Sequence, residues 1–483
     1  MNTRHVDVLI VGAGISGVGA AYHLQDNCPG KTYAVIESRD AVGGTWDLFR
    51  YPGIRSDSDM YTFGFNFKPW VSPKAISPGG DIRRYIAEAA AENGIDKHIH
   101  FGHRVIAADW CSKAALWKAQ VRELASGEVS EISSHFFFSG GGYYNYDEGY
   151  TPEFDGVESF RGQVIHPQKW PADLDYAGKK IIVIGSGATA VTLVPSLAET
   201  AANVIMLQRS PTYIASRPEQ DAFGNAARKY LPAGLAYSVT RWKNILWGMY
   251  TYRLSRRRPE LIKKFIINGV REYLGRDYDV EKHFTPSYKP WDQRVCLVPD
   301  GDLFKAIKRG AVTMVTDHID RFTETGIALK SGEQLAADII VTATGLNAEI
   351  FSGMQLSVDG TPVEPAKTVS YKGMMLSGLP NFVFSMGYTN ASWTLKSDLV
   401  GEYMCRLLKY MDKHGFRMCV PTLPAEGIEP DLMMNLTSGY VLRARDSMPR
   451  QGVARPWKLY QNYILDRFSL GMGSVTDSGI RFS

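Results

Sequence analysis

Residues 7–17 read Asp-Val-Leu-Ile-Val-Gly-Ala-Gly-Ile-Ser-Gly, and this stretch decides the fold of the first part of the chain. A short apolar run ends at Gly12, a helical pattern follows, and a second strand is expected at 32–37. In a dinucleotide-binding strand–helix–strand unit, Gly12 permits the tight turn, Gly14 lets a pyrophosphate approach the backbone, and Gly17 lets helix and strand pack closely. The stretch therefore predicts an α/β fold that binds a dinucleotide at the start of the helix.

The residues that follow indicate which dinucleotide binds. Glu37 ends the second predicted strand, 20 residues after Gly17. A carboxylate at this position accepts hydrogen bonds from ribose hydroxyls and repels a 2′-phosphate, so the site suits FAD or NAD and not NADP. A second glycine pair follows in Gly43-Gly44-Thr45-Trp46-Asp47. This pair could be a plain loop, but it is common where flavin domains wrap the ribityl chain and pyrophosphate, and it favours FAD.

A second copy of the unit begins at residues 180–185 and continues through the turn Gly185-Ser186-Gly187-Ala188-Thr189-Ala190. Its second strand is expected at 203–208 and is followed by Arg209 and Ser210, with no acid in the ribose position. The planar guanidinium of Arg209 suits a pair of phosphate oxygens, which predicts NADP, with NADPH as the electron donor. The alternative is a surface arginine paired with a nearby acid.

Two such units about 170 positions apart predict two Rossmann-like domains, one for FAD and one for NADP. Residues 338–345 form another buried strand ending at glycine and resemble residues 136–141, where the chain leaves the first domain. We therefore expect the NADP domain to be inserted in the FAD domain. The expected division is 1–145 for the first part of the FAD domain, 146–335 for the NADP domain with a helical insertion at about 218–290, and 336–483 for the return to the FAD domain and the C-terminal segment.

Composition excludes several classes of protein. Of 483 residues, 45% are apolar and 22% charged, and the net charge of +4 gives no basic field for nucleic acid. The five cysteines show neither C-x-x-C nor metal-ligand spacing, which argues against the flavin disulfide reductases and against a metal site. Scattered cysteines predict reduced thiols in a cytoplasmic protein. No charged leader and no run of eighteen apolar residues is found, so neither a signal peptide nor a spanning helix is expected.

Residues 241–276 combine ten Lys or Arg with interleaved Trp, Tyr and aliphatic residues. A basic amphipathic stretch can rest peripherally on an anionic membrane surface. The sequence favours the other interpretation, a solvated helical insertion that covers the active site.

Between the two glycine-rich turns lies the run Phe160-Arg161-Gly162-Gln163-Val164-Ile165-His166-Pro167-Gln168-Lys169-Trp170, followed by Pro171. With this F-x-G-x-x-x-H-x-x-x-W-P segment and both turns, the chain resembles the Baeyer–Villiger monooxygenases, which are class B flavoprotein monooxygenases. It looks most like their ethionamide-activating branch, on residues 51–61, Trp291-Asp292-Gln293-Arg294 and residues 388–394. The resemblance extends over essentially the whole chain. One departure is Ser139-Gly140-Gly141-Gly142, which is richer in glycine than the usual version.

The resemblance implies an NADPH- and O2-dependent enzyme that converts ketones to esters or lactones through a peroxyflavin and oxidises sulfides or thioamides in parallel. It implies that Arg294 lies beside the flavin ring and that Asp57 pairs with it. We assign Arg55 and Ser56 to NADP. The segment containing Phe160, Gly162, His166 and Trp170 is implied to be an interdomain linker that couples domain movement to catalysis. The implied FAD contacts are Ser16, Glu37, Thr45, Trp46, Asp47, Leu48, Asp57 and Val105, beside the glycines Gly12, Gly14, Gly17 and Gly44.

The chemistry supports a role for Arg294 independently. A guanidinium that is never deprotonated stabilises a peroxide anion and the tetrahedral adduct without supplying a proton that would release hydrogen peroxide. Two alternatives remain: an N- or S-oxygenating flavin monooxygenase with little ketone activity, which Trp170 and Pro171 disfavour, and a non-catalytic dinucleotide-binding protein. The sequence leaves the substrate and the oligomeric state open. Candidates for the wall of the substrate pocket, all of which could equally be core, are Phe63, Phe65, Trp70, Met375 and Trp393.

Overall fold

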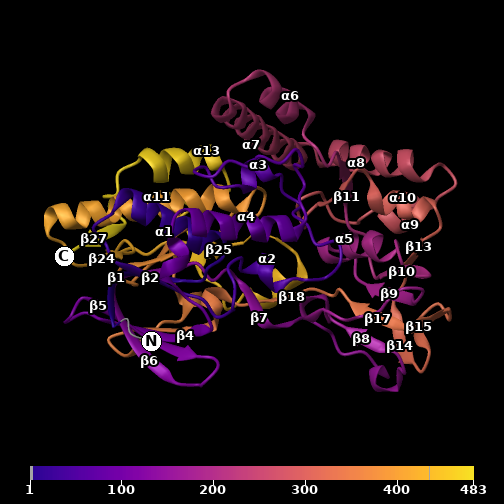
Figure 1. Ribbon diagram of the computed structural model, residues 1–483, viewed down its shortest axis with the longest axis horizontal. Coiled ribbons are helices and arrows are strands. Elements are labelled where there is room, and N and C mark those ends of the chain that lie inside the picture. The colour runs from indigo at the N-terminus through magenta and orange to yellow at the C-terminus, as the bar shows by residue number, and fades with distance from the viewer. Residues whose placement is uncertain (1–3, 435) are drawn as a thin grey trace.

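The computed structural model describes residues 4–434 and 436–483 and contains two main β-sheets with helices packed on them (Figure 1). The larger sheet has nine strands in the order β20-β19-β4-β5-β6-β1-β2-β3, with β23 paired to β6. The strand bounds are β1 His5–Val11, β2 Tyr33–Ile36, β3 Ile99–His100, β4 His103–Cys111, β5 Leu116–Glu123, β6 Val129–Ser139, β19 Gln355–Val358, β20 Thr361–Pro362 and β23 Phe382–Phe384.

The centre of this sheet is parallel and buried on both faces. β1 pairs in parallel with β2 and β6, and alternate β1 residues enter two different cores. Val8 and Ile10 pack with residues of α1 (Ile15–Asn27), α4 (Gly79–Glu92) and α11 (Trp393–His414), whereas Leu9 packs with Trp117 and Phe137. Burial on both sides explains why the stretch is continuously apolar and not alternating.

The smaller sheet has five parallel strands in the order β13-β10-β9-β17-β8. Their bounds are β8 Gln163–Ile165, β9 Lys180–Ile184, β10 Asn203–Gln208, β13 Val312–Thr316 and β17 Ile339–Thr342, and the helices α5 (Ala188–Leu197) and α10 (Asp302–Lys308) pack against this sheet. The two strand–helix–strand units expected from the glycine-rich turns are therefore both present. The predicted α/β fold with two Rossmann-like units is confirmed.

The chain passes between the two sheets through one antiparallel pair, β7 (Tyr144–Gly149) with β18 (Leu346–Ala348). β7 begins beside the expected boundary at residue 145. β17 lies beyond the expected boundary at residue 335, and it lies between β8 and β9 in the smaller sheet. The sequence shows a buried strand there but not the sheet that it joins. We propose placing this boundary after β17; β19, β23 and α11 then return to the larger sheet.

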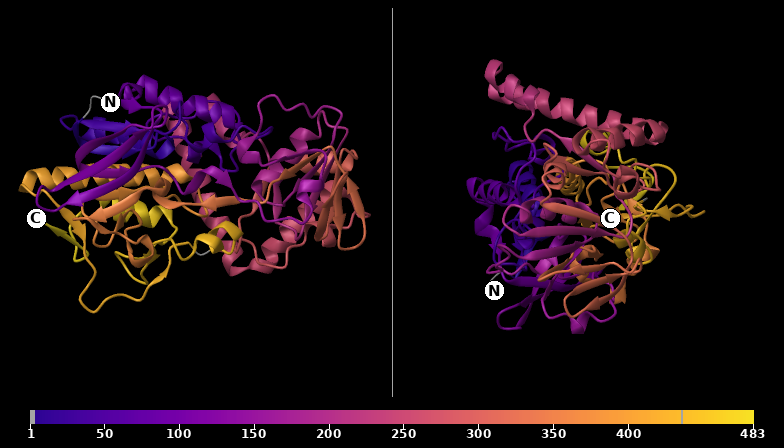
Figure 2. Two further views of the ribbon diagram at one scale, coloured as in Figure 1. Left: turned by 90° about the horizontal axis from the view of Figure 1, so that it is seen from below. Right: turned by 90° about the vertical axis from the view of Figure 1, so that its right-hand side faces the viewer.

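The helical insertion consists of α6 (Ala222–Tyr230), α7 (Ala233–Arg257), α8 (Pro259–Leu274) and α9 (Val280–Phe284), enclosed by β11 (Ile214–Arg217) paired with β12 (Cys296–Pro299). α6, α7 and α8 lie along the upper edge of the molecule in Figure 1, and the right-hand view in Figure 2 shows the same outer position. α7 packs on α3 (Met60–Phe63) of the larger unit. In the described part of the chain, no helix is both long and apolar enough to cross a bilayer.

The remaining elements are short. They are α2 Thr45–Leu48, α12 Gly439–Ala444, α13 Tyr463–Asp466, β14 Ile319–Thr323, β15 Gly326–Leu329, β16 Gln334–Ala336, β21 Ser370–Tyr371, β22 Met375–Leu376, β24 Cys419–Pro421, β25 Asp431–Leu432, β26 Arg450–Gln451 and β27 Ile480–Phe482, with the single turns η1 Ile95–His98, η2 Val157–Ser159, η3 Pro167–Lys169, η4 Ile350–Gly353, η5 Pro365–Lys367 and η6 Arg467–Met472.

Candidate active site

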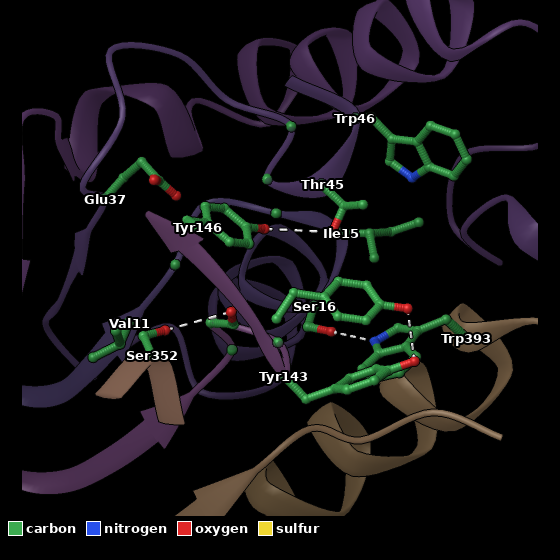
Figure 3. Close-up of a pocket in the computed structure, with 18 of the residues that line it drawn as sticks. Val11, Ile15, Ser16, Glu37, Thr45, Trp46, Tyr143, Tyr146, Ser352 and Trp393 are labelled. Carbon is green, nitrogen blue, oxygen red and sulfur yellow. Dashed lines mark hydrogen bonds between the residues drawn. The ribbon is translucent and has the colours of Figure 1, made fainter. Parts of the chain in front are cut away.

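A long cavity follows the carboxyl ends of β1, β2 and β6 and encloses about 1410 Å³ of empty space, its open mouth included (Figure 3). Glu37 lies at one side of it, and Trp46 and Trp393 lie at the opposite side. The predicted site residues that line the cavity are Gly12, Gly14, Ser16, Glu37, Gly44, Thr45, Trp46, Ser56, Asp57, Val105 and Arg294. One cavity thus brings together most of the residues assigned to FAD and both predicted catalytic residues.

Bare backbone forms one wall, because two glycine-rich turns touch there. A Cβ on Gly17 would lie 1.8 Å from the carbonyl oxygen of Gly12, so Gly17 does not line the cavity but lets α1 begin directly against β1. Gly44 has a φ of +55°, and a Cβ on it would lie 3.0 Å from the Cα of Gly14. With no side chains in the way, a pyrophosphate can approach the amide groups at the start of α1.

Glu37 is buried at the edge of the cavity. Its Oε2 accepts a hydrogen bond from the Ala13 N–H at 2.6 Å, and its Oε1 accepts one from the Arg39 N–H at 2.9 Å. Burial raises the pKa of the carboxyl group, and the two backbone hydrogen bonds oppose that rise. A carboxylate fixed in this way has lone pairs left for the hydroxyls of a ribose.

The segment containing Trp393 contacts the first glycine-rich turn directly. The indole Nε1 of Trp393 donates a hydrogen bond to Ser16 Oγ at 2.8 Å (Figure 3). The ring of Tyr143 stacks on Trp393, with centroids 5.4 Å apart. Residues from the beginning, middle and end of the chain therefore fix the aromatic side of the cavity.

Arg294 precedes β12 and reaches the same cavity. Burial lowers the pKa of its guanidinium, but the neighbouring Tyr143, Tyr440 and Asp57 outweigh burial, and the net effect raises the pKa. Its Nε is buried without a hydrogen-bond partner among the described residues. The expected ion pair between Arg294 and Asp57 is not formed in this structure, since no nitrogen of Arg294 lies within 4.0 Å of an Asp57 carboxylate oxygen in the described ranges. A buried donor without a partner is costly, so a bound acceptor would fit here.

Three tyrosines near Arg294 were not anticipated from the sequence. The hydroxyls of Tyr143 and Tyr144 are 2.9 Å apart, and the ring of Tyr440 lies 6.3 Å from that of Tyr143. Burial raises the pKa of all three phenols, that of Tyr144 to about 12, so they stay protonated near neutral pH. For Tyr143 and Tyr144, the available signal was the run Tyr143-Tyr144-Asn145-Tyr146 directly after the glycines.

The second glycine-rich turn is open to its surroundings. Gly187 precedes α5, and a Cβ on it would meet no atom within 4 Å. Ser186 Oγ donates a hydrogen bond to the Ser210 carbonyl at 3.1 Å, which joins the turn to the end of β10. Arg209 is exposed and forms no ion pair with the described residues, so the alternative of a surface arginine paired with an acid is not observed. Ala188, Thr189 and Ala190 form the first turn of α5.

Three predicted cofactor residues have other partners. The guanidinium of Arg55 forms an ion pair with Asp302 at 2.5 Å, whereas its neighbour Ser56 lines the first cavity instead of the second turn. Asp47 accepts a hydrogen bond from Arg39 Nε at 2.7 Å and does not line the cavity. Leu48 is part of the core of the smaller unit. These contacts were not visible in the sequence, because the partners lie on other elements.

The middle of the F-x-G-x-x-x-H-x-x-x-W segment, β8, belongs to the smaller sheet, and the implied role of the segment as an interdomain linker stays a prediction. β8, which lies in this segment, pairs with β17, and a Cβ on Gly162 would lie 2.2 Å from the Asp338 carbonyl oxygen. His166 Nε2 lies 3.1 Å from the Gly345 carbonyl, and its ring fills the space beside Gly149, so it contacts both crossing segments. Burial lowers the pKa of this imidazole.

The two aromatic ends of the segment pack locally. The ring of Phe160 lies 6.5 Å from that of Phe322 within a small core cluster. The ring of Trp170 lies 6.3 Å from that of Tyr176 and has no ring contact with His166 among the described residues. Of the substrate-pocket candidates, Phe63 and Trp393 line the cavity. The other three, Phe65, Trp70 and Met375, are core residues.

The fold and the two turns define a protein that holds two dinucleotides, the first in a cavity with a cation at its aromatic end. Comparison with known proteins narrows this class. The flavin-binding monooxygenase-like family matches residues 77–380, and an NAD(P)-binding Rossmann-like domain matches residues 10–72. These matches agree with the predicted cofactors, FAD and NADP(H).

The chain is similar over its whole length to curated proteins. It is 54% identical to the FAD-containing monooxygenase EthA of Mycobacterium tuberculosis over 482 residues, covering 100% of this chain and 98% of that protein. It is 49% identical to the probable FAD-binding monooxygenase AlmA of Acinetobacter baylyi, covering 99% of this chain and 96% of that protein. The chain therefore belongs to the flavin-binding monooxygenase-like family.

Solved structures share the fold. An oxidised steroid monooxygenase bound to NADP superimposes with a TM-score of 0.78 at 23% identity, covering 99% of both chains. An open structure of cyclohexanone monooxygenase gives a TM-score of 0.75 at 21% identity, covering 100% of both chains. These solved structures confirm the fold that the resemblance implied, and the matches above confirm a flavin-binding monooxygenase.

Proposed function

We propose that this protein is an FAD-containing, NADPH- and O2-dependent monooxygenase that converts ketones to esters or lactones and oxidises sulfides or thioamides in parallel. The observation that carries the proposal is the guanidinium of Arg294, which lies in the cavity with its Nε buried and without a partner among the described residues. Family membership supports the monooxygenase class. The choice of ketones rests on the cation and its surroundings.

The first cavity fits FAD. Its bare glycine wall suits a pyrophosphate, Glu37 suits the ribose hydroxyls, and Trp46 and Phe63 offer apolar surface at the far end. The turn before α5 fits NADPH, with open space at Gly187 and the exposed guanidinium of Arg209 for a 2′-phosphate. The bound flavin would supply hydride uptake from NADPH and the activation of oxygen.

The protein's own contribution at the reacting end is electrostatic. Arg294 stays cationic at every working pH, because a guanidinium does not lose its proton in proteins, and the neighbouring Asp57 favours the cation further. It can stabilise the negative charge that develops on the carbonyl oxygen of a ketone without giving up a proton. Asp57 favours that cation, and the protonated Tyr143 offers a neutral donor.

The test is a reaction of the purified protein with NADPH, 18O2 and an equimolar mixture of an aryl ketone and an aryl thioether. The proposal predicts an ester that carries one 18O atom, formed with one NADPH consumed, together with labelled sulfoxide. Consumption of NADPH with hydrogen peroxide as the only oxygen product would refute it. Labelled sulfoxide with untouched ketone would instead establish the N- or S-oxygenating alternative.

A further inference from the structure

The outer side of α6, α7 and α8 exposes large apolar side chains. Tyr230, Trp247, Tyr250, Leu261 and Phe265 are each between 56% and 75% exposed. On α7 the rings of Trp247 and Tyr250 lie side by side, with centroids 5.9 Å apart. On α8, Leu261 and Phe265 are one helical turn apart and share a face. We call this side of the three helices the outer helical face.

These apolar residues are not needed to hold the helices in place, because each helix has a second, buried face. Ile245 of α7 is 4% exposed, and Ile266, Ile267 and Val270 of α8 are 8% exposed or less. Arg241 of α7 is also buried, and its guanidinium donates to the carbonyls of Tyr61 and Gly64. This arginine, counted as a surface cation in the sequence, therefore anchors α7 to the larger unit.

The same outer face is strongly cationic. Residues 222–274 contain eleven Lys or Arg but only two acids, Glu260 and Glu272. Some of these cations have acidic partners, such as Arg256 with Asp292 at 2.7 Å. Between residues 241 and 274, four exposed cations form no ion pair with the described residues: Arg253, Arg257, Arg258 and Lys264. These four residues lie at the end of α7 and at the start of α8, close in sequence to the exposed aromatic residues.

We propose that the outer helical face rests on an anionic lipid bilayer, with Trp247, Tyr250 and Phe265 in the interface and Arg257, Arg258 and Lys264 at the headgroups. Aromatic rings favour the level of the headgroups, and basic side chains are attracted by anionic lipid. A second copy of the chain fits this face less well than a bilayer does, since a two-fold interface would place the two cationic clusters against each other, where they repel. The described residues form no spanning helix, so the protein would lie on the membrane surface.

The test measures sedimentation of the holoenzyme with phosphatidylcholine vesicles that contain or lack phosphatidylglycerol. We expect binding only with phosphatidylglycerol, weakened by salt. Each cation near the surface contributes about fivefold, so Arg257→Gln, Arg258→Gln and Lys264→Gln together should weaken binding by up to roughly 100-fold. The matched control changes three exposed lysines that form no ion pair with the residues the structure describes, Lys118→Gln, Lys179→Gln and Lys330→Gln, and should bind like the unmodified protein.

A second variant tests the apolar part: Trp247→Ser, Tyr250→Ser and Phe265→Ser should bind at least about tenfold more weakly, whereas Leu124→Ser with Val129→Ser should not. The proposal is overturned if anionic vesicles fail to bind the protein, or if the face variants and controls bind equally. It is also overturned if light scattering shows that the face variants dissociate an oligomer while vesicle binding is absent. These readouts do not depend on the reaction catalysed.

Discussion

Replacing Arg209 with alanine should weaken the use of NADPH and leave the use of NADH unchanged. The guanidinium is exposed at the end of β10, beside the turn formed by Ser186 and Gly187, and forms no ion pair with the described residues. Its removal therefore costs the fold little, and the effect should appear in cofactor use. A charge-assisted hydrogen bond contributes roughly 1.5–3 kcal/mol. Because this site is exposed and screened, we expect about 1–2 kcal/mol, which is about a 5- to 30-fold loss.

The assay is kcat/KM for NADPH and for NADH, measured with a saturating ketone at low and high salt. We expect the value for NADPH to fall by that factor and the value for NADH to stay unchanged, with a smaller difference at high salt. Arg217→Ala, an exposed arginine at the end of β11, serves as the control and should change neither value. An equal loss with both cofactors, or none with either, would refute recognition of the 2′-phosphate by Arg209.

Three further outcomes are expected. Gly17→Ala should lower the free energy of unfolding by at least about 2 kcal/mol and release flavin on purification, because the new Cβ would lie 1.8 Å from a backbone oxygen. The control Gly30→Ala should have neither effect, because its Cβ would meet no atom within 4 Å. Thermal melts followed by flavin fluorescence measure both effects. The pKa of His166 is lowered in the folded state, so the free energy of unfolding should fall as the pH drops below the unfolded-state pKa of 6.5. In urea titrations at several pH values, His166→Gln should make this fall smaller. An unchanged dependence of the free energy of unfolding on pH would contradict this reasoning. Lys396→Met should lower the free energy of unfolding by about 3–5 kcal/mol, because Asp466 loses an ion-pair partner at 2.9 Å and both side chains are at most 13% exposed. A decrease below about 1 kcal/mol would show that this ion pair is unimportant for stability.

The parts of the fold that could be predicted from the sequence are those that depend on local backbone requirements. Gly12, Gly17 and Gly187 mark strand-to-helix turns because a Cβ there would clash or block a phosphate, and that need is visible in the residue itself. Glu37 and Arg209 follow at fixed distances from those turns. The two strand–helix–strand units were therefore predicted with nearly correct bounds.

The rest depends on contacts between distant segments. A buried strand ending in glycine shows burial but not its neighbours, so the sheet that β17 joins could not be predicted. Tyr440 reaches Arg294 only because the chain returns to the larger unit after β18. Arg241 was counted with the basic amphipathic stretch and Asp47 with the FAD contacts, yet both side chains are buried with partners on other segments. Residue type alone does not reveal which side of a helix faces the core.

The central claim is that the guanidinium of Arg294 acts in oxygen transfer, and the most direct measurement is the rate of ester formation by the FAD-loaded Arg294→Ala variant. We predict that flavin content stays unchanged while ester formation falls by roughly 100- to 1,000-fold or more, with partial recovery in Arg294→Lys. Ester formed by Arg294→Ala at the rate of the unmodified enzyme would contradict the account.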